Sequence, residues 1–177
     1  MNGVKIMEAI LSRRSIRKYT NQSVPEQTIK ELLEAAMSAP SAGNQQPWQF
    51  VVIKERKILD EIPKFHPFSQ MLREAQLAIL VCGDLELEKN KGYWVQDCSA
   101  ATENILIAAT AKGLGAVWLG IYPRKERIAG IKKLLSLPEH VIPLSLISIG
   151  YPAEQKPPAN RYDSSRIHYN HWQENHV

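Results

Sequence analysis

The chain has 177 residues, of which 44% are hydrophobic and 23% charged, and its formal net charge is +4. This size and composition predict one globular domain over residues 1–177 and exclude a disordered or fibrous protein. No apolar run approaches the roughly 20 residues that span a bilayer, and residues 1–5 lack a signal-peptide core, so no membrane segment is expected.

Charge distribution and cysteine usage narrow the class of protein further. Lys and Arg are mostly interspersed with acids, which disfavours a nucleic-acid-binding face, although residues 13–18 hold a local basic cluster. The two cysteines lie in apolar stretches without CxxC spacing. They are therefore interpreted as buried thiols of a protein in the reducing cytoplasm rather than as a disulfide or a metal site.

The first motif follows a short helix predicted over residues 7–12. Residues 13–19 alternate in a way that suits an extended segment rather than a helix. Such a segment can direct Arg13, Ser15 and Arg17 at one anion, which suits a phosphate monoester. Four basic residues alone are equally typical of a solvated basic turn.

A second helix is predicted from Pro25 to about residue 38, because a proline at its first turn precedes a helical apolar pattern. The loop 39–48 follows and leads into a strand over residues 49–54. Two prolines constrain this loop, Gly43 allows a tight turn, and its Ser, Asn and Gln residues offer uncharged donors and acceptors. Taken alone, it could also be a polar connector.

The middle of the chain predicts two further short helices and a buried strand. The helices are expected near residues 56–62 and 69–74, on either side of a loop that carries His66. A packed or surface role is favoured for this lone histidine. The continuous apolar run 75–82 is typical of a central strand.

The last part of the chain predicts the longest helix, over residues 93–112, followed by a strand over 116–121, a helix over 124–135 and a strand over 143–150. The long helix is apolar on more than one face, so partial burial by a partner chain is plausible. The stretch from residue 152 onward is rich in Pro, Asn and charge and is expected to be irregular.

Five short motifs occur in order along the chain, and together they resemble the short members of the FMN-dependent nitroreductase family. They are RRSIRKY at 13–19, APSAGNQQPW at 39–48, CGD at 82–84, GLGAVWLG at 113–120 and IGYP at 149–152. The resemblance covers nearly the whole chain. It implies an α+β fold with a mostly antiparallel central sheet flanked by helices, assembled as an intertwined homodimer with FMN at the subunit interface.

The resemblance assigns a phosphate-binding role to the first motif. Arg13, Ser15 and Arg17 would hold the FMN phosphate, with Arg14 as a backbone or ribityl neighbour. In the C-terminal tail, Arg161 is the best positional match for a basic residue that closes over the phosphate.

The resemblance also implies which residues meet the flavin ring. The segment Trp118, Leu119 and Gly120 would lie along the isoalloxazine with backbone N–H groups near N5, and longer family members carry an acid where this chain has Gly120. Gln70 is a further candidate in a loop that cannot be aligned residue by residue. Contacts from the other subunit's loop are implied for Pro40, Ser41, Ala42, Asn44 and Gln46.

The activity implied is a ping-pong oxidoreductase that takes hydride from NADH or NADPH and reduces nitro compounds, quinones or related acceptors. The flavin carries the redox chemistry, so no catalytic side chain and no metal is expected. Three alternatives remain open: a flavin reductase or ene-type reductase with another physiological acceptor, an FMN-binding protein without turnover, and, if the resemblance is discarded, a nucleic-acid binder that uses its basic N-terminal segment.

Overall fold

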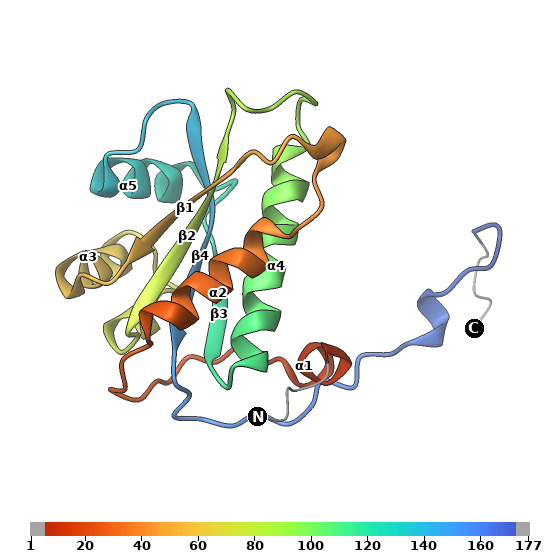
Figure 1. Ribbon diagram of the computed structural model, residues 1–177, viewed down its shortest axis with the longest axis horizontal. Helices are drawn as coiled ribbons and strands as arrows, with labels where there is room; N and C mark the ends of the chain where they lie inside the picture. Colours follow the sequence, from red (N-terminus) through yellow and green to blue (C-terminus); the bar gives the residue numbers. More distant parts are fainter. Residues whose placement is uncertain (1–5, 173–177) are drawn as a thin grey trace.

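The computed structural model describes residues 6–172, and its main elements are five α-helices and four strands (Figure 1). In chain order they are α1 Ile6–Ser12, α2 Glu26–Met37, β1 Trp48–Ile53, α3 Arg56–Glu61, β2 Leu77–Asp84, α4 Trp94–Ala111, β3 Gly115–Gly120, α5 Lys125–Leu135 and β4 Val141–Gly150. Short 3-10 turns lie at Ala42–Asn44, Ile62–Lys64, Gln70–Arg73 and Ser164–Arg166. Among the described residues, no helix is long and apolar enough to cross a bilayer.

The four strands form one sheet in the order β1-β2-β4-β3, and each neighbouring pair is antiparallel. This arrangement confirms the expected antiparallel sheet. Helices α2 and α4 cover one face, whereas α3 and α5 lie on the other (Figure 1). The sheet is therefore buried on both sides between two helical layers.

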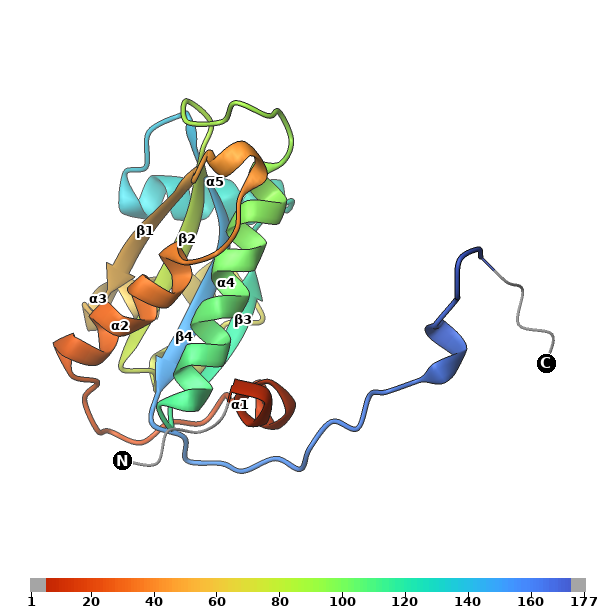
Figure 2. The ribbon, with the colours of Figure 1, turned by 45° about the vertical axis from the view of Figure 1, so that its right-hand side comes forward.

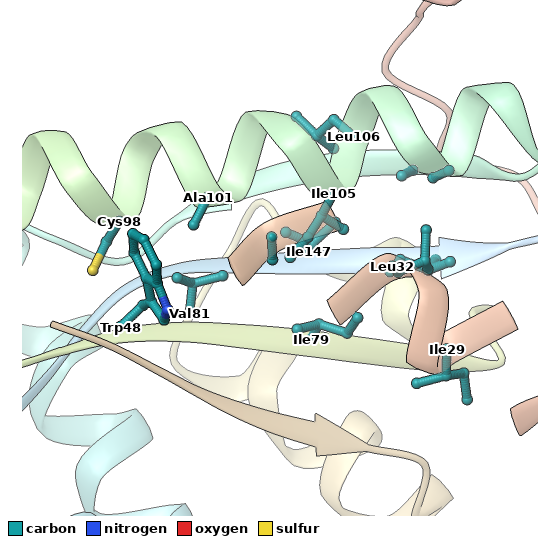
Figure 3. Close-up of a cluster of buried hydrophobic side chains, with 14 of the residues drawn as sticks. Ile29, Leu32, Trp48, Ile79, Val81, Cys98, Ala101, Ile105, Leu106 and Ile147 are labelled. Atoms are coloured by element: carbon teal, nitrogen blue, oxygen red, sulfur yellow. The ribbon is translucent and has the colours of Figure 1, made fainter. Parts of the chain in front are cut away.

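Burial on both faces explains why β2 is an uninterrupted apolar run. Side chains alternate across a strand, so Ile79 and Val81 enter the core shared with α2 and α4 (Figure 3), whereas Leu80 and Cys82 enter the opposite core. A strand with one wet face would instead alternate apolar and polar residues. All eight residues of β2 are buried.

Two strand boundaries differ from the sequence-based prediction. The second strand begins at Leu77 and includes Gly83 and Asp84, where its end was expected. The last strand begins two residues before Pro143, at Val141. Proline cannot donate to a ladder, and the register of β2 against β4 shifts between Val81 and Cys82, opposite this proline. The irregularity accommodates a proline inside a central strand.

The segment 13–19 has no helical or long strand structure and docks along the outer edge of β3. Ser15 forms a parallel bridge with Ala116, and the Ile16 N–H donates to the Ala116 carbonyl at 3.0 Å. Ile16 and Tyr19 are buried, so their side chains anchor the segment to the body. The extended conformation expected for this motif is thus confirmed.

The chain after β4 first runs beside this segment and then leaves the body of the molecule (Figure 2). Tyr19 bridges Pro152, and the Ala153 N–H donates to the Lys18 carbonyl at 2.9 Å. Farther along, Tyr162, Tyr169 and Trp172 are more than 70% exposed. Apart from the short turn Ser164–Arg166, this described part of the tail lacks regular structure, as the sequence predicts.

Docking of the segment 13–19 depends on Gly115, and this contact yields a first prediction. A Cβ at this position would lie 2.6 Å from Cγ2 of Ile16. We expect Gly115→Ala to lower the free energy of unfolding by about 1–3 kcal/mol, because this overpacking pushes the segment away from β3. Urea denaturation measures the loss.

The double variant Gly115→Ala/Ile16→Ala tests the cause of that loss. Ile16→Ala removes the contacts with Cγ2 at 2.6 Å and Cγ1 at 3.3 Å but leaves Cβ at 2.8 Å. It therefore relieves part of the clash, and the double variant should be destabilised by less than the sum of the two single variants. Additive losses would show that the Ile16 contact is not the source of the strain.

Candidate functional site

A cavity of about 450 Å³ opens beside the end of β3, on the side away from β4. Its walls come from the segment 13–19, the loop after α3, β3 and α5. The lining residues are Arg17, His66, Pro67, Phe68, Gln70, Met71, Trp118, Leu119, Gly120 and Arg127. The cavity therefore combines aromatic and aliphatic surface with two guanidinium groups and no acidic lining residue.

The edge of β3 supplies backbone polar groups to this cavity. Along an antiparallel edge strand, alternate residues direct their N–H and C=O groups away from the sheet. The carbonyls of Ala116 and Gly120 both accept hydrogen bonds from outside the sheet, whereas the Ile121 N–H donates to Leu144 of β4. Trp118 is two residues from both Ala116 and Gly120, so its N–H and C=O groups point the same way as theirs. The backbone groups of Trp118 and Gly120 therefore face away from β4.

Leu119 differs from its two neighbours. Its side chain is buried in the core between the sheet and α5, whereas Trp118 is 37% exposed and a Cβ added at Gly120 would meet no atom within 4 Å. Trp118 and Gly120 are thus the residues of the predicted ring-binding segment that present themselves to a ligand. Gln70, the candidate from the loop that could not be aligned, also lines this cavity.

A second cavity, of about 520 Å³, gathers two predicted phosphate-binding residues, Arg13 and Arg161, and the predicted ribityl neighbour Arg14. Its walls come from α1, the start of the segment 13–19 and the tail, and the lining residues are Ile10, Leu11, Arg13, Arg14, Pro158, Ala159, Asn160, Arg161 and Tyr162. Arg161 is more than 140 positions from the other two arginines in the chain, and the tail brings it beside them. Arg17 is not among these residues and lines the first cavity instead.

The arginines of the second cavity are held by neighbouring groups. Arg13 Nε lies 3.2 Å from Oε1 of Glu103 on α4, and Arg14 Nε donates to the Pro157 carbonyl at 2.6 Å. The guanidinium of Arg13 therefore carries one acidic partner from the protein. Its remaining donors are available to a second anion.

Ser15 and Arg17 are fixed through their backbones. Lys156 Nζ donates to the Ser15 carbonyl at 2.7 Å, and the Arg17 N–H donates to Oε1 of Glu154 at 2.6 Å. The hydrogen bond from Arg17, together with the nearby Lys156, holds the pKa of the Glu154 carboxyl below its ordinary value. These contacts use only backbone atoms of Ser15 and Arg17, so neither side chain is needed to hold the segment in place.

The loop 39–48 lies at the opposite end of α4 from α1 and outside both cavities (Figure 1). It rests on Asp97, which is buried and accepts from the Ala42 N–H at 3.0 Å and from Nε2 of Gln45 at 2.7 Å. Asp97 therefore has a structural role, because it holds the loop against the first turn of α4. Gln45 was not singled out from the sequence, yet its Oε1 also accepts two backbone N–H groups, from residues 89 and 90.

Among the predicted contact residues of this loop, Pro40, Asn44 and Gln46 are exposed, and Ser41 and Ala42 are half-buried. Ser41 Oγ accepts from the Gln46 N–H at 3.0 Å, and Gln46 Nε2 donates to Asn44 Oδ1 at 2.9 Å. Asn44 and Gln46 both have positive φ angles, of 52° and 48°. Pro40, Ser41, Ala42, Asn44 and Gln46 thus form a tightly hydrogen-bonded projection that contacts neither cavity of its own chain.

His66 is the clearest residue that sequence reasoning missed. It is 1% exposed, and its Nε2 lies 3.1 Å from the Gly120 carbonyl oxygen. Burial, and then the positive charge of Arg127, lower the pKa of the imidazole below its ordinary value. A histidine between two aromatic residues is an ordinary packing signal, and only the fold brings it to the end of β3.

One group of described residues has the composition of a metal site. Ligand atoms of Asp84, Glu86 and His140 lie within 4.8 Å of one another, away from both cavities. His140 lies between the two carboxylates, with Nε2 4.0 Å from Asp84 Oδ1 and Nδ1 3.6 Å from Glu86 Oε1. Exposed acidic groups often lie together without an ion, so we assign no metal to this group.

The sequence matches a known protein family and is similar to a named protein. The sequence pattern of the Nitroreductase family matches residues 10–78 and 66–151. A protein of Methanothermobacter thermautotrophicus, provisionally named NADH dehydrogenase/NAD(P)H nitroreductase, is 52% identical over 94% of this chain and 87% of its own length.

Two solved structures are similar over nearly their full length. An FMN-dependent nitroreductase of Clostridium difficile superposes with a TM-score of 0.87 at 30% identity, covering 94% of this chain and 99% of that one. A provisionally named nitroreductase of Desulfovibrio desulfuricans, in complex with FMN, gives 0.83 at 33% identity, covering 96% and 98%. The sequence match, the antiparallel sheet between two helical layers and these superpositions agree, and the chain belongs to the nitroreductase family.

Proposed function

We propose that this protein is an FMN-dependent oxidoreductase that oxidises NADH or NADPH and reduces nitro compounds, quinones or related acceptors. The observation that carries the proposal is the first cavity, where outward backbone groups of Trp118 and Gly120 meet aromatic surface and the guanidinium of Arg17. The names of the similar proteins support the same cofactor, reductant and acceptor class.

The residues present fit FMN. An isoalloxazine ring has apolar faces and an edge of N and O atoms, and the first cavity offers Phe68 and Trp118 for the faces and backbone N–H groups for the edge. Bound FMN would supply the hydride transfer. The protein binds and orients the ring, and no acidic side chain lines the cavity to repel a reduced flavin.

The phosphate fits the second cavity. Arg13, Arg14 and Arg161 line it, and Ser15 is adjacent to them in the chain, so guanidinium forks can bind the phosphate oxygens bidentately. In this arrangement Arg17 stays with the ring rather than with the phosphate. The cofactor would therefore extend along the segment 13–17 between the two cavities.

We further propose that two copies of the chain form the functional unit. The projection made by Pro40, Ser41, Ala42, Asn44 and Gln46 contacts neither cavity of its own chain, so it is available to complete the site of a partner. Met7 and Leu11 on α1 are more than 60% exposed, as are the aromatic residues of the tail. Exposed apolar residues on a terminal helix and a protruding tail suit burial in an intertwined dimer.

The same proposal includes a single domain over residues 1–177 and residence in the cytoplasm. Cys82 and Cys98 are free and buried, and burial raises the pKa of the Cys82 thiol to about 12. Unpaired, unreactive thiols suit a reducing compartment.

Flavin loading and reduction test the activity. Purified protein reconstituted with FMN should be yellow, and anaerobic NADH or NADPH should bleach the flavin absorbance because hydride reaches the ring. A nitroaromatic compound or a quinone should then restore the colour. A protein that holds FMN but is bleached by neither nicotinamide would be a binding protein without turnover, and one that holds no FMN would contradict the proposal.

Removing Arg13 tests the phosphate site. We expect Arg13→Ala to weaken FMN binding by about tenfold to a hundredfold, because a charge-assisted hydrogen bond to the phosphate is lost. Fluorescence titration of the apoprotein with FMN measures the dissociation constant. Glu103→Gln is the matched control: it breaks the same ion pair but keeps the guanidinium, so FMN affinity should be unchanged or higher. Equal weakening in both variants would assign the effect to the ion pair instead.

Mixed dimers test whether the loop acts on the partner. We expect Arg13→Ala and the double variant Asn44→Ala/Gln46→Ala each to lose FMN as homodimers. In a dimer that combines one subunit of each kind, one site has an intact arginine and an intact partner loop, so half of the flavin absorbance should return. If each loop served its own subunit, both sites would be defective and no flavin would return.

A further inference from the structure

The end of β3 is held by two side chains that the activity does not otherwise use. The Gly120 carbonyl oxygen accepts from His66 Nε2 at 3.1 Å and from Arg127 Nη1 at 2.7 Å. The two donors come from different elements, the loop after α3 and helix α5. On the opposite side of the chain, the N–H groups of Ile121 and Tyr122 both donate to the Leu144 carbonyl of β4.

His66 is itself rigid. Its backbone N–H donates to the Ile62 carbonyl at 3.0 Å, and its own carbonyl accepts from both the N–H and the hydroxyl of the buried Ser69. Because a carbonyl oxygen only accepts, Nε2 must carry the proton in the contact with Gly120. The neutral imidazole favoured by burial and by Arg127 has its single proton at this atom.

The other ring nitrogen of His66 has no partner. Nδ1 is the one buried side-chain N or O atom without a hydrogen bond in the part of the chain that the structure describes. An unsatisfied buried acceptor destabilises the folded protein, because it loses its hydrogen bond to water on folding and gains none. A leucine of similar volume would avoid this cost, so stability alone does not account for a histidine here.

The guanidinium of Arg127 also contacts an aromatic ring. Its guanidinium carbon lies 5.6 Å from the centroid of Phe68, within the range of a cation–π contact. Phe68 and Arg127 both line the first cavity. The guanidinium is therefore a positive charge held at the wall of the cavity and bonded to the same carbonyl as His66.

Gly120, whose carbonyl accepts both hydrogen bonds, has no side chain to help fix its backbone conformation. Gly120 ends β3, its Cβ position is open space, and glycine has more backbone freedom than any other residue. The N–H group of Gly120 points outward on the same side of the strand as its carbonyl, which is bonded to the two side chains. If that carbonyl were released, the N–H could turn away from a ligand.

We propose that His66 and Arg127 are positioning residues that clamp the Gly120 carbonyl and thereby aim the outward N–H groups of Trp118 and Gly120 at the flavin ring. This inference rests on the proposed function. The cation of Arg127 additionally favours a negatively charged reduced flavin over the neutral oxidised one. Neither side chain donates or accepts hydride, and neither needs to touch the ring.

The experiment compares variants that keep or remove each donor in the FMN-loaded protein. His66→Leu and Arg127→Met remove the donors, His66→Gln keeps an N–H near the position of Nε2, and Arg124→Met removes an exposed cation at the start of the same helix. Stopped-flow absorbance gives the anaerobic rate of flavin reduction at saturating NADH or NADPH. Redox titration gives the midpoint potential of the bound flavin.

We expect His66→Leu and Arg127→Met to slow flavin reduction by about tenfold to a hundredfold, as a misplaced donor would. Arg127→Met should also lower the midpoint potential, because a positive charge beside the reduced flavin is lost. His66→Gln should recover most of the rate, and Arg124→Met should match the wild type in both measurements.

The possible failures are distinguishable. A wild-type protein that does not bind FMN, or is not reduced by nicotinamide, would contradict the proposed function itself. Wild-type rates and potentials in FMN-loaded His66→Leu and Arg127→Met would contradict only the clamp. If His66→Leu does not fold, the result for Arg127→Met decides whether the clamp exists. A flavin reduction rate in His66→Gln below a tenth of the wild-type rate would argue against a donor role for Nε2.

Discussion

The unpaired edge of β3 is the constraint on which the rest of the site depends. A strand at the end of a sheet leaves every second N–H and C=O without a strand partner, and proteins normally cover or blunt such an edge. Here one end is covered by the segment 13–19 through Ala116, and the other by His66 and Arg127 through Gly120. The stretch around Trp118 between them remains open to a cavity, so an incomplete sheet edge becomes a ligand-binding surface.

The two helical layers fix the position of this edge strand. With both faces of the sheet buried, β3 is fixed in register against β4, and Leu119 and Val117 anchor it in the core on the α5 side. A shift by one residue would send apolar side chains to the wrong layer and turn the outward backbone groups inward. Packing far from the cavity therefore determines which N–H groups face a ligand.

Much of the fold was predictable from the sequence because local patterns determine it. The helical spacing of α2 and α4, the apolar run of β2 and the extended segment 13–19 all appear as expected, with boundaries within two residues. The early start of β4 was not predictable, because a proline normally excludes a central strand and only the register shift beside Pro143 permits it.

The sequence motifs of the site were predictable, but which residues lie together in each cavity was not. Arg17 stands four positions from Arg13, yet the two line different cavities, with the bridge from Ser15 to Ala116 between them in the chain. Arg127 and His66 meet at Gly120 from distant parts of the chain, and no spacing in the sequence encodes that meeting. Local signals identify which residues are unusual, whereas tertiary packing decides which of them act together.

The strained loop on top of α4 has a consequence for assembly. Gly43, Asn44 and Gln46 adopt left-handed backbone angles, and for the two non-glycine residues this costs about 1–3 kcal/mol each. The carboxylate of Asp97 and the buried amide of Gln45 hold the loop in this shape within a single chain. The conformational entropy of the loop is thus lost during folding of the subunit, before any encounter. In the proposed dimer, subunits that meet with a prearranged loop would associate without a slow ordering step, so association and cofactor capture would follow the kinetics of rigid-body docking.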